Sequence, residues 1–369
     1  MTEPLPLEER ARLSAQQFNA AAGAVQRLGN GLINDTFLVS AAGSPRFVLQ
    51  RINSRVFRDP AAILHNLRTI QEHLSGRGLR RGEPDGALIL PRLIPTRDGA
   101  DYLVDSEGEW WRAQEYIENT ETVEAIDVPE RAEQVGRGLG RFHRLFEDLD
   151  AEELRDTLPG FHVTPDYLQQ FRKVFEGIEL RRAREIRMWE EFIGMRTAAA
   201  GVLERAREQG RVAVRVVHGD PKLNNFLFRR DDHRVVGLID LDTVRPGLIH
   251  HDLGDCLRSC CNTAGEDGVL GGPVSFDLGI AEAILRGYLA EARGLLSATE
   301  LALIGATSWL IPFELGVRFL TDYLCGNLYF KVANPQQNLH RALVQFRLTE
   351  SIEQVSPQIE QLVDEIAGR

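Results

Sequence analysis

The sequence predicts an α+β fold of two lobes, a small N-terminal lobe built on an antiparallel sheet and a larger, mainly helical C-terminal lobe. Up to about residue 118, short runs rich in Val, Ile, Phe and Trp alternate with polar residues and are separated by turn residues, as in strands. From residue 129 onward, apolar residues recur every three or four positions, as in amphipathic helices. With 369 residues, 43% of them hydrophobic, the chain can bury a core large enough for two lobes.

Residues 24–53 are predicted to form a β-hairpin whose first strand begins with a glycine-containing loop. Gly29, Asn30 and Gly31 open that strand, and glycines let backbone amides approach phosphate groups closely. The loop is therefore predicted to cover a nucleotide phosphate, with Asn34 where a third glycine of GxGxxG would stand. A lone GxG is a weak signal, so an ordinary hairpin corner is the alternative.

The rest of the small lobe is predicted to hold two helices and further strands. Residues 6–18 have the pattern of a polar helix, and residues 59–74 that of an amphipathic helix that starts at Asp59 and Pro60. Strands are predicted within residues 87–118, and polar residues follow them.

The lobe boundary is expected at a polar hinge near residues 115–121. We expect residues 1–118 to form the nucleotide-binding lobe and residues 119–369 the helical catalytic and substrate-binding lobe. Within the hinge, Glu115 and Ile117 are predicted to bind the nucleotide.

A long helix is predicted after Pro129, with Val135, Leu139, Phe142 and Phe146 facing the core. The GRGLG run inside it resembles a dinucleotide-binding loop only superficially, because no strand precedes it and the helical spacing continues through it. Close helix packing explains these glycines better. Most of the chain beyond this helix also has helical spacing.

The most informative motif is VVHGDPKLNNFLF, followed by VVGLIDLDT. In phosphoryl transfer a loop Asp accepts the proton of the acceptor hydroxyl, an Asn five residues on holds a metal ion, and a later Asp holds Mg²⁺. Asp220 and Asn225 have this spacing, and Asp240 follows at the end of the second predicted strand. Asp220 is therefore the predicted base, and Lys222 is placed to reach the γ-phosphate as a point charge.

The metal site is predicted to consist of Asn225, Asp240 and Asp242, because Mg²⁺ prefers oxygen ligands. Asp240 and Asp242 lie two residues apart in a segment expected to be extended, so their side chains should point the same way and converge on one cation. His218 is expected to brace the loop. Each of these residues alone is common by chance, and surface carboxylates usually face water only; the prediction depends on their combination in chain order.

Composition excludes several classes of function. The net charge is −11 and the pI about 5.4, so the chain lacks the basic surface that binds nucleic acid. The N-terminal residues have no apolar signal region, and the most apolar helical stretch carries Pro312, Glu314 and Arg318. We therefore expect a cytoplasmic protein with no membrane partner. The four cysteines match no metal or redox spacing, and the sequence leaves the oligomeric state open.

Taken together, the small sheet lobe, the polar hinge, HGDPKLNN and IDLD resemble the protein-kinase-like small-molecule kinases of the aminoglycoside phosphotransferase and choline kinase group. A closer resemblance is to the bacterial N-acetylhexosamine 1-kinases, on the glycine loop, VLQRIN, KLNN, IDLDT and GVRFLTDYLCGNLYF. This resemblance implies a protein-kinase-like fold and transfer of the ATP γ-phosphate, with Mg²⁺, to the anomeric hydroxyl of an N-acetylhexosamine. It also implies that Arg318 and Tyr329 contact the sugar. An exposed helical ion pair of Arg318 with Glu314 or Asp322 is the alternative.

One residue departs from the general pattern. Protein kinases place a Lys on the third strand to pair with the nucleotide phosphates, whereas this chain has Gln50 there. We therefore expect Gln50 to lie in the nucleotide site and the phosphates to be bound in a different way. Two alternatives therefore stay open. One is another alcohol kinase of the same fold, acting on an aminoglycoside, choline, homoserine or a hexose; the other is a non-catalytic regulator that binds a nucleotide or sugar.

Overall fold

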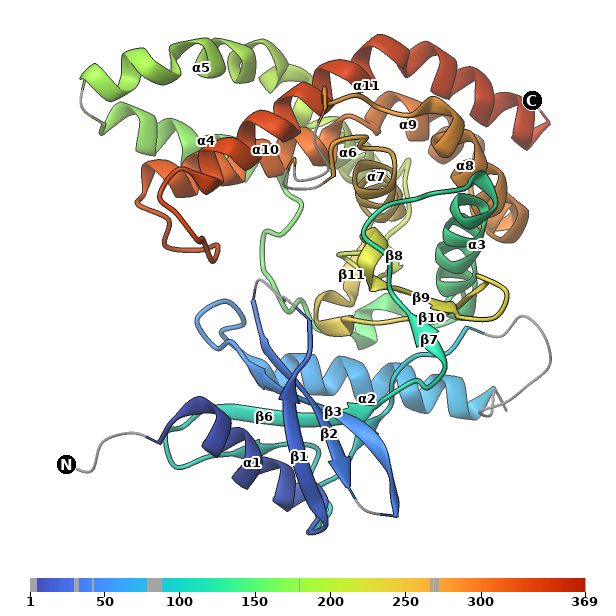
Figure 1. Ribbon diagram of the computed structural model, residues 1–369. Coiled ribbons are helices and arrows are strands. Elements are labelled where there is room, and N and C mark those ends of the chain that lie inside the picture. Colours follow the sequence, from blue (N-terminus) through green and yellow to red (C-terminus); the bar gives the residue numbers. More distant parts are fainter. Residues whose placement is uncertain are drawn as a thin grey trace.

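The predicted two-lobe α+β architecture is confirmed. The computed structural model describes residues 5–29, 33–41, 43–77, 88–178, 180–265, 268 and 272–368. An antiparallel-sheet lobe formed by the first part of the chain lies against a larger lobe made mainly of helices (Figure 1).

The small lobe is a sheet with one helix on each side. Its strands are β1 (Ala22–Arg27), β2 (Asp35–Ala41), β3 (Ser44–Ile52), β4 (Leu93–Ile94), β5 (Leu103–Val104) and β6 (Trp110–Glu115). They follow the order β1-β2-β3-β6-β4, with β5 also paired to β6, and every pair is antiparallel. Helix α1 (Leu7–Phe18) packs on one face, and α2 (Pro60–Gly76) lies between the sheet and the helical lobe (Figure 1).

Strand alternation sorts the residues of β6 between the two faces. Trp111 and Ala113 are fully buried and belong to the apolar cluster under α1. Arg112 and Gln114, one residue out of phase, therefore point to the opposite face, toward the helical lobe, and both are also buried. The small lobe thus presents polar side chains where it meets the other lobe.

The sequence prediction missed strand β1. The predicted hairpin exists as β2 and β3, but β2 begins only at Asp35, and Gly29 follows a separate strand, β1, that pairs antiparallel with β2. The run from Ala22 to Arg27 is short in β-branched residues, which explains why it gave no strand signal.

The helical lobe begins after the hinge. Strand β6 ends at Glu115, and β7 (Thr120–Glu121) pairs with β9 of the second lobe. The remaining elements are α3 (Pro129–Leu145), η1 (Ala151–Glu153), α4 (Thr164–Glu176), α5 (Leu180–Ala200), α6 (Val202–Glu208), β8 (Arg215–Val217), η2 (Leu223–Asn225), β9 (Phe226–Arg229), β10 (Val235–Leu238), η3 (Leu241–Thr243), β11 (Arg245–Gly247), α7 (Ile249–Cys260), α8 (Leu278–Ala292), η4 (Arg293–Leu295), α9 (Ala298–Thr307), α10 (Leu310–Leu324) and α11 (Gln337–Ala367).

Helices α3 and α8 pack unusually closely, as the GRGLG run predicts. A Cβ atom on Gly136 would lie 2.0 Å from the carbonyl oxygen of Ile284, and one on Gly140 would lie 2.8 Å from that of Tyr288. The predicted inward residues of α3, from Val135 to Phe142, are fully buried. The glycines therefore serve helix contact, and α3 supplies a rigid support behind the catalytic loop.

Helices α9 and α10 are the only apolar pair that meets the length and composition of a membrane span within the part of the chain that the structure describes, and they are bent by 47° at their junction. No single helix among those residues is long and apolar enough to cross a membrane.

Candidate active site

The catalytic motif forms the loop between β8 and β9. Gly219 has a φ of +87°, and a Cβ atom there would lie 2.6 Å from the carbonyl oxygen of Thr243, so only glycine fits. This turn carries the chain from the buried His218 to Asp220, whose side chain is 29% exposed. Asp220 thus faces solvent from a tightly fixed backbone.

A buried carboxylate, Asp252 of α7, holds this loop from behind. Its two oxygens accept hydrogen bonds from the backbone N–H groups of His218 (2.7 Å) and Gly219 (2.8 Å). Nε2 of His143, on α3, lies 3.0 Å from the same carboxylate. Burial alone would raise the pKa of Asp252, but these partners, His143 first, hold the pKa below its usual value, so the group is a permanent anion that anchors the loop.

His218 braces the loop, as the sequence predicts. Its Nδ1 accepts a hydrogen bond from the backbone N–H of Asp220 at 3.3 Å, and its Nε2 lies 3.0 Å from the carbonyl oxygen of Ile239. Burial lowers the pKa of the imidazole, so the ring is neutral, with Nε2 as donor and Nδ1 as acceptor. His218 therefore links the loop of the predicted base to the segment that leads to Asp240.

Asp220, Lys222 and Asn225 form one cluster. Nζ of Lys222 lies 2.9 Å from Oδ2 of Asp220. Nδ2 of Asn225 donates to the backbone carbonyl oxygen of Asp220 at 2.7 Å and more weakly to its Oδ2 at 3.4 Å. Because the amide nitrogen of Asn225 is fixed in this way, its Oδ1 is the atom left to meet a cation.

Asp240 is the carboxylate best suited to a divalent cation. Water reaches its side chain, yet the protein surrounds it so closely that desolvation, followed by the neighbouring charge of Asp242, raises its pKa to about 7. Lys222 and Arg112 oppose this shift only as nearby charges, and no described residue donates a hydrogen bond to the Asp240 side chain. A carboxylate with no protein donor and with its ionised form disfavoured would gain from a divalent cation.

The reason given for a convergence of Asp240 and Asp242 on one cation, an extended backbone through both residues, does not hold. The strand β10 ends at Leu238, Asp240 has a left-handed backbone with φ of +64°, and Asp242 lies in the 3-10 turn η3, so strand alternation does not apply. Asp242 is instead buried and accepts hydrogen bonds from Arg112 to Oδ1 and from Asn34 to Oδ2, the latter at 2.6 Å. Both its oxygens thus bind the small lobe, so Asp240 and Asn225 are the stronger candidates for metal ligands, and a contact of Asp242 with the cation stays a prediction.

Such a pair fits Mg²⁺. Among the described residues, no group of three or more His, Cys, Asp and Glu side chains is arranged to hold a metal ion. Mg²⁺ in nucleotide sites, however, is usually held by one or two carboxylates together with substrate phosphates and water. The oxygen donors of Asp240 and Asn225, next to Asp220, satisfy that requirement.

On the nucleotide side the structure describes most, but not all, of the predicted residues. Gly29 has a φ of +69° with open space where a Cβ would be, whereas Asn30 and Gly31 lie outside the described residues. Asn34 accepts the backbone N–H of Asn53 on its Oδ1 at 2.9 Å while it donates to Asp242. This amide therefore ties the end of the loop to the helical lobe.

Gln50 lies in the same polar layer. Its Nε2 donates to Oγ1 of Thr36 at 3.1 Å, and its Oε1 accepts from Arg112 at 2.7 and 3.1 Å. The third strand lacks the usual lysine, but Arg112 on the adjacent strand β6 brings a positive charge next to that position. The sequence analysis did not identify Arg112.

The hinge residues Glu115 and Ile117 lie between the lobes. The backbone N–H of Glu115 donates to the carbonyl oxygen of Arg92 at 2.9 Å, and the carbonyl oxygen of Ile117 accepts from Oγ1 of Thr120 at 2.7 Å. Ile117 is 9% exposed and packs as an apolar residue. Their contact with a nucleotide stays a prediction.

Arg318 and Tyr329 come together, and Asp220 is close enough for its charge to act on Arg318. The guanidinium of Arg318 lies 5.8 Å from the ring centre of Tyr329 and within 5.6 Å of three further rings, those of Phe161, Tyr167 and Phe330. Only 12% of the Arg318 side chain is exposed. Burial by itself would lower the pKa of Arg318. The surrounding groups, Tyr167 first and Asp220 among them, outweigh burial and raise that pKa.

The alternative of an exposed ion pair for Arg318 is therefore wrong. Glu314 is buried, and its nearest oxygen is 4.0 Å from the guanidinium, at the limit of an ion pair. Asp322 does not pair with Arg318 at all; it accepts the backbone N–H groups of residues 328–330 and so fixes the loop that carries Tyr329.

His162 is a second residue that the sequence analysis missed. Its Nδ1 lies 2.9 Å from Oε1 of Glu314 and its Nε2 3.1 Å from the carbonyl oxygen of Gly219. It links the support of Arg318 directly to the catalytic loop. No local motif surrounds His162, so only its contacts in the folded chain reveal it.

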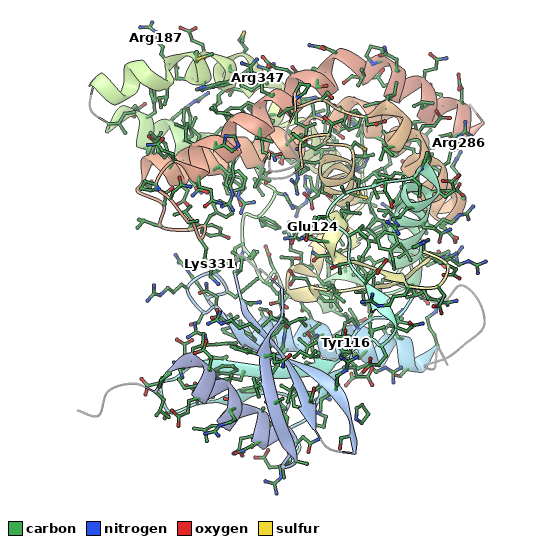
Figure 2. The ribbon with its side chains drawn as sticks, in the orientation of Figure 1. Tyr116, Glu124, Arg187, Arg286, Lys331 and Arg347 are labelled. Atoms are coloured by element: carbon green, nitrogen blue, oxygen red, sulfur yellow. The ribbon has the colours of Figure 1, made fainter. Side chains whose placement is uncertain are left out.

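The loop after α10 also reaches the small lobe. Figure 2 shows Lys331 on the side of the helical lobe that faces the sheet, and its Nζ lies 3.7 Å from Oδ1 of Asp35 at the start of β2. The start of β2 and the loop that follows α10 therefore lie side by side where the lobes meet.

Comparison with known proteins agrees with this geometry. A crystal structure of an aminoglycoside phosphotransferase from Alicyclobacillus acidocaldarius superposes with a TM-score of 0.64 at 18% identity, covering 99% of this chain and 98% of that chain. The microcompartment-associated aminopropanol kinase gives 0.62 at 16%, with 95% and 98% covered. Choline kinase from Cryptosporidium parvum gives 0.54 at 15%, with 95% and 94% covered.

At these identities the likeness shows a shared fold. The family follows from the sequence itself, because residues 24–296, well over half of the chain, match the model of the phosphotransferase enzyme family. That span includes the glycine loop, the hinge, Asp220, Asn225 and Asp240. The chain therefore belongs to the phosphotransferase enzyme family.

Proposed function

We propose that this phosphotransferase is an ATP- and Mg²⁺-dependent kinase that phosphorylates the anomeric hydroxyl of an N-acetylhexosamine. The observation that carries the proposal is the position of Asp220. It contacts Lys222 and Asn225, next to the metal-suited carboxylate Asp240. Its charge also acts on Arg318, whose guanidinium lies among aromatic rings.

The nucleotide side supports ATP with a divalent cation. Asp240 and Asn225 are the residues that would hold Mg²⁺, which when bound would neutralise charge on the phosphate oxygens. A structural neighbour, an amicoumacin kinase with a TM-score of 0.54 at 15% identity, was solved in complex with AMP-PNP and Ca²⁺. A nucleotide and a divalent cation in that fold are consistent with the arrangement here.

The chemistry assigned to the chain is positioning and proton transfer. Asp220 would accept a hydrogen bond from the acceptor hydroxyl, orient its oxygen toward the γ-phosphorus, and take its proton as the P–O bond forms. Lys222, already 2.9 Å from Asp220, would place its charge by the transferring phosphoryl group. The fixed backbone at Gly219 keeps this geometry from relaxing.

The charge of the acceptor side favours a neutral sugar. A choline or aminoglycoside acceptor brings its own positive charge, which would meet the buried cation of Arg318 in a partly desolvated site. A hexosamine whose amine is acetylated is uncharged and offers hydroxyl and carbonyl oxygens to the guanidinium donors. Aromatic rings such as Tyr329, 42% exposed, suit the apolar face of a sugar ring.

The test is a panel of acceptors incubated with MgATP, with the products identified by phosphorus NMR and by a reducing-end assay. N-acetylglucosamine or N-acetylgalactosamine should give a phosphate ester without a reducing end. Plain hexoses should react roughly 10- to 100-fold more slowly, because they leave the partners of the acetamido group unpaired. A product that keeps its reducing end, or equal rates for hexoses, would reject the assignment.

The same panel separates the alternatives. Faster turnover of choline, homoserine or an aminoglycoside would identify another alcohol kinase of this fold. Formation of no ADP with any alcohol would favour a non-catalytic regulator.

A further inference from the structure

We propose that Arg112 of strand β6 is the cation that holds the nucleotide phosphates in this chain, in the role that the third-strand lysine has in protein kinases. The proposal deepens the proposed function and rests on its nucleotide half, not on the identity of the acceptor. Arg112 is paired with the buried Asp242.

The register of the sheet places Arg112 beside the vacant lysine position. Gln50 pairs directly with Arg112 across β3 and β6, and with Thr36 across β2 and β3. The three side chains form one hydrogen-bonded row, in which Gln50 accepts two hydrogen bonds from the guanidinium and donates one to Thr36. An amide at position 50 can orient a guanidinium but carries no charge of its own, so the positive charge of this row is that of Arg112.

Arg112 has a donor to spare. Its side chain is completely buried; Nε and Nη2 contact Gln50 and Asp242, while Nη1 is buried without a hydrogen-bond partner in the part of the chain that the structure describes. A buried guanidinium N–H that stays unpaired costs free energy, and native proteins rarely leave one without a ligand or other partner. Phosphate oxygens fit this atom, because the planar fork of an arginine matches phosphate geometry.

The surroundings of Arg112 belong to the nucleotide side. Asp242, its ionic partner, also binds Asn34 at the end of the glycine loop. Arg112 also lies close enough to Asp240, the candidate metal ligand, for the two charges to interact. A phosphate chain that reaches a cation held by Asp240 would therefore come close to Arg112.

The competing explanation is that Arg112 only neutralises Asp242. A structural counterion would affect folding and every ligand alike, whereas a phosphate-binding residue affects only ligands that carry phosphate. Comparing MgATP with adenosine, which has the same base and ribose but no phosphate, distinguishes the two roles.

The experiment measures the affinity of MgATP and of adenosine by calorimetry for the wild type, Arg112→Gln and the double variant Gln50→Lys/Arg112→Gln. Arg112→Gln should weaken MgATP roughly 10- to 100-fold and change adenosine affinity by less than about 3-fold, because only the charge-assisted hydrogen bonds to phosphate are lost. The double variant moves the cation to the third strand and should recover most of the MgATP affinity. Equal losses for both ligands, no loss for MgATP, or no recovery in the double variant would overturn the proposal.

Two further variants keep the test valid if Arg112→Gln folds poorly. Arg112→Lys keeps the charge beside Asp242 but loses the fork, so MgATP affinity should still fall several-fold while adenosine binds as in the wild type. Arg10→Gln breaks a comparable ion pair, with Asp105, on the other face of the same sheet, and should leave MgATP binding unchanged. An unchanged MgATP affinity in Arg112→Lys together with Arg112→Gln would reject the assignment.

The outcome is distinguishable from failure of the sugar assignment. A wild type that binds MgATP but phosphorylates no N-acetylhexosamine refutes the acceptor while the binding comparison above still decides the role of Arg112. A wild type that does not bind MgATP refutes both.

Discussion

At the scale of single residues, the local motif predicted the catalytic loop well, because its contacts are local. Asp220, Lys222 and Asn225 lie within six residues of chain, and the structure brings them into one cluster. The pairing of Asp242 with Arg112 was not predicted. Those two residues are 130 positions apart and meet only in the folded chain, so no spacing rule reveals the pair.

The clearest residue-scale prediction concerns Asp240. Asp240→Asn removes a charged oxygen ligand, so the affinity for MgATP should fall about 10- to 100-fold, whereas the affinity for ATP without Mg²⁺ should stay nearly the same. Calorimetric titrations with and without Mg²⁺ measure both. Asp232→Asn, in an exposed turn, is the matched control. Equal weakening in the presence and absence of Mg²⁺ would exclude Asp240 as a metal ligand.

At the scale of elements, the periodicity of apolar residues predicted the long helices but not the point at which a strand ends. The inward face of α3 and the close packing of its glycines follow from spacing and size, and both are present. The bend of the chain at Asp240 does not follow from the sequence, because a run of Val, Gly, Leu and Ile also fits a longer strand. The contact between α3 and α8 is the element-scale feature that is easiest to test.

Gly136→Ala should destabilise the protein, because the new methyl group would lie 2.0 Å from the backbone oxygen of Ile284. Overpacking of this kind costs about 1–3 kcal/mol or more. Gly194→Ala, in the exposed part of α5 with nothing within 4 Å, is the control and should stabilise by about 0.4–1 kcal/mol. Urea unfolding of the two variants gives both values, and a stabilising Gly136→Ala would contradict the packing described for α3 and α8.

At the scale of the whole molecule, polar contacts join the two lobes around the site. Arg112 and Asn34 bind Asp242, Lys331 pairs with Asp35, and Nδ2 of Asn66 on α2 donates to the carbonyl oxygen of Val244 at 2.8 Å. The sequence predicted the two lobes and a hinge between them. It could not predict how the lobes are held together, because each of these contacts joins residues distant in the chain.

Stability should also depend on pH through Glu204 of α6. Burial, with a smaller contribution from the charge of Glu314, raises the pKa of this carboxyl to about 7 against backbone N–H groups and Arg205, which lower it. Its two oxygens accept no well-formed hydrogen bond from the described residues. Between the usual value near 4.5 and about 7 the folded state therefore holds a proton that the unfolded chain releases, so the free energy of unfolding falls as pH rises through this window.

Glu204→Gln removes this titration. The variant should be more stable than the wild type at pH 8 and similar to it at pH 4.5, as judged from urea unfolding at the two pH values. Arg215 lowers the pKa of Glu300 to about 2 against the effect of burial. The free energy of unfolding therefore falls through Glu300 only as the pH drops below about 4.5, outside the pH range in which Glu204 titrates. A variant less stable than the wild type at pH 8 would show that Glu204 has a partner when ionised.

The central claim is that Asp220 is the proton acceptor at the junction of the nucleotide and acceptor sides. The most direct measurement is the turnover number of Asp220→Asn with MgATP and N-acetylglucosamine, together with its MgATP affinity. The account predicts a turnover number lower by roughly 10²- to 10⁴-fold with MgATP affinity within a few-fold of the wild type, because the base acts on the acceptor and does not hold the nucleotide. A variant that keeps wild-type turnover would contradict the account.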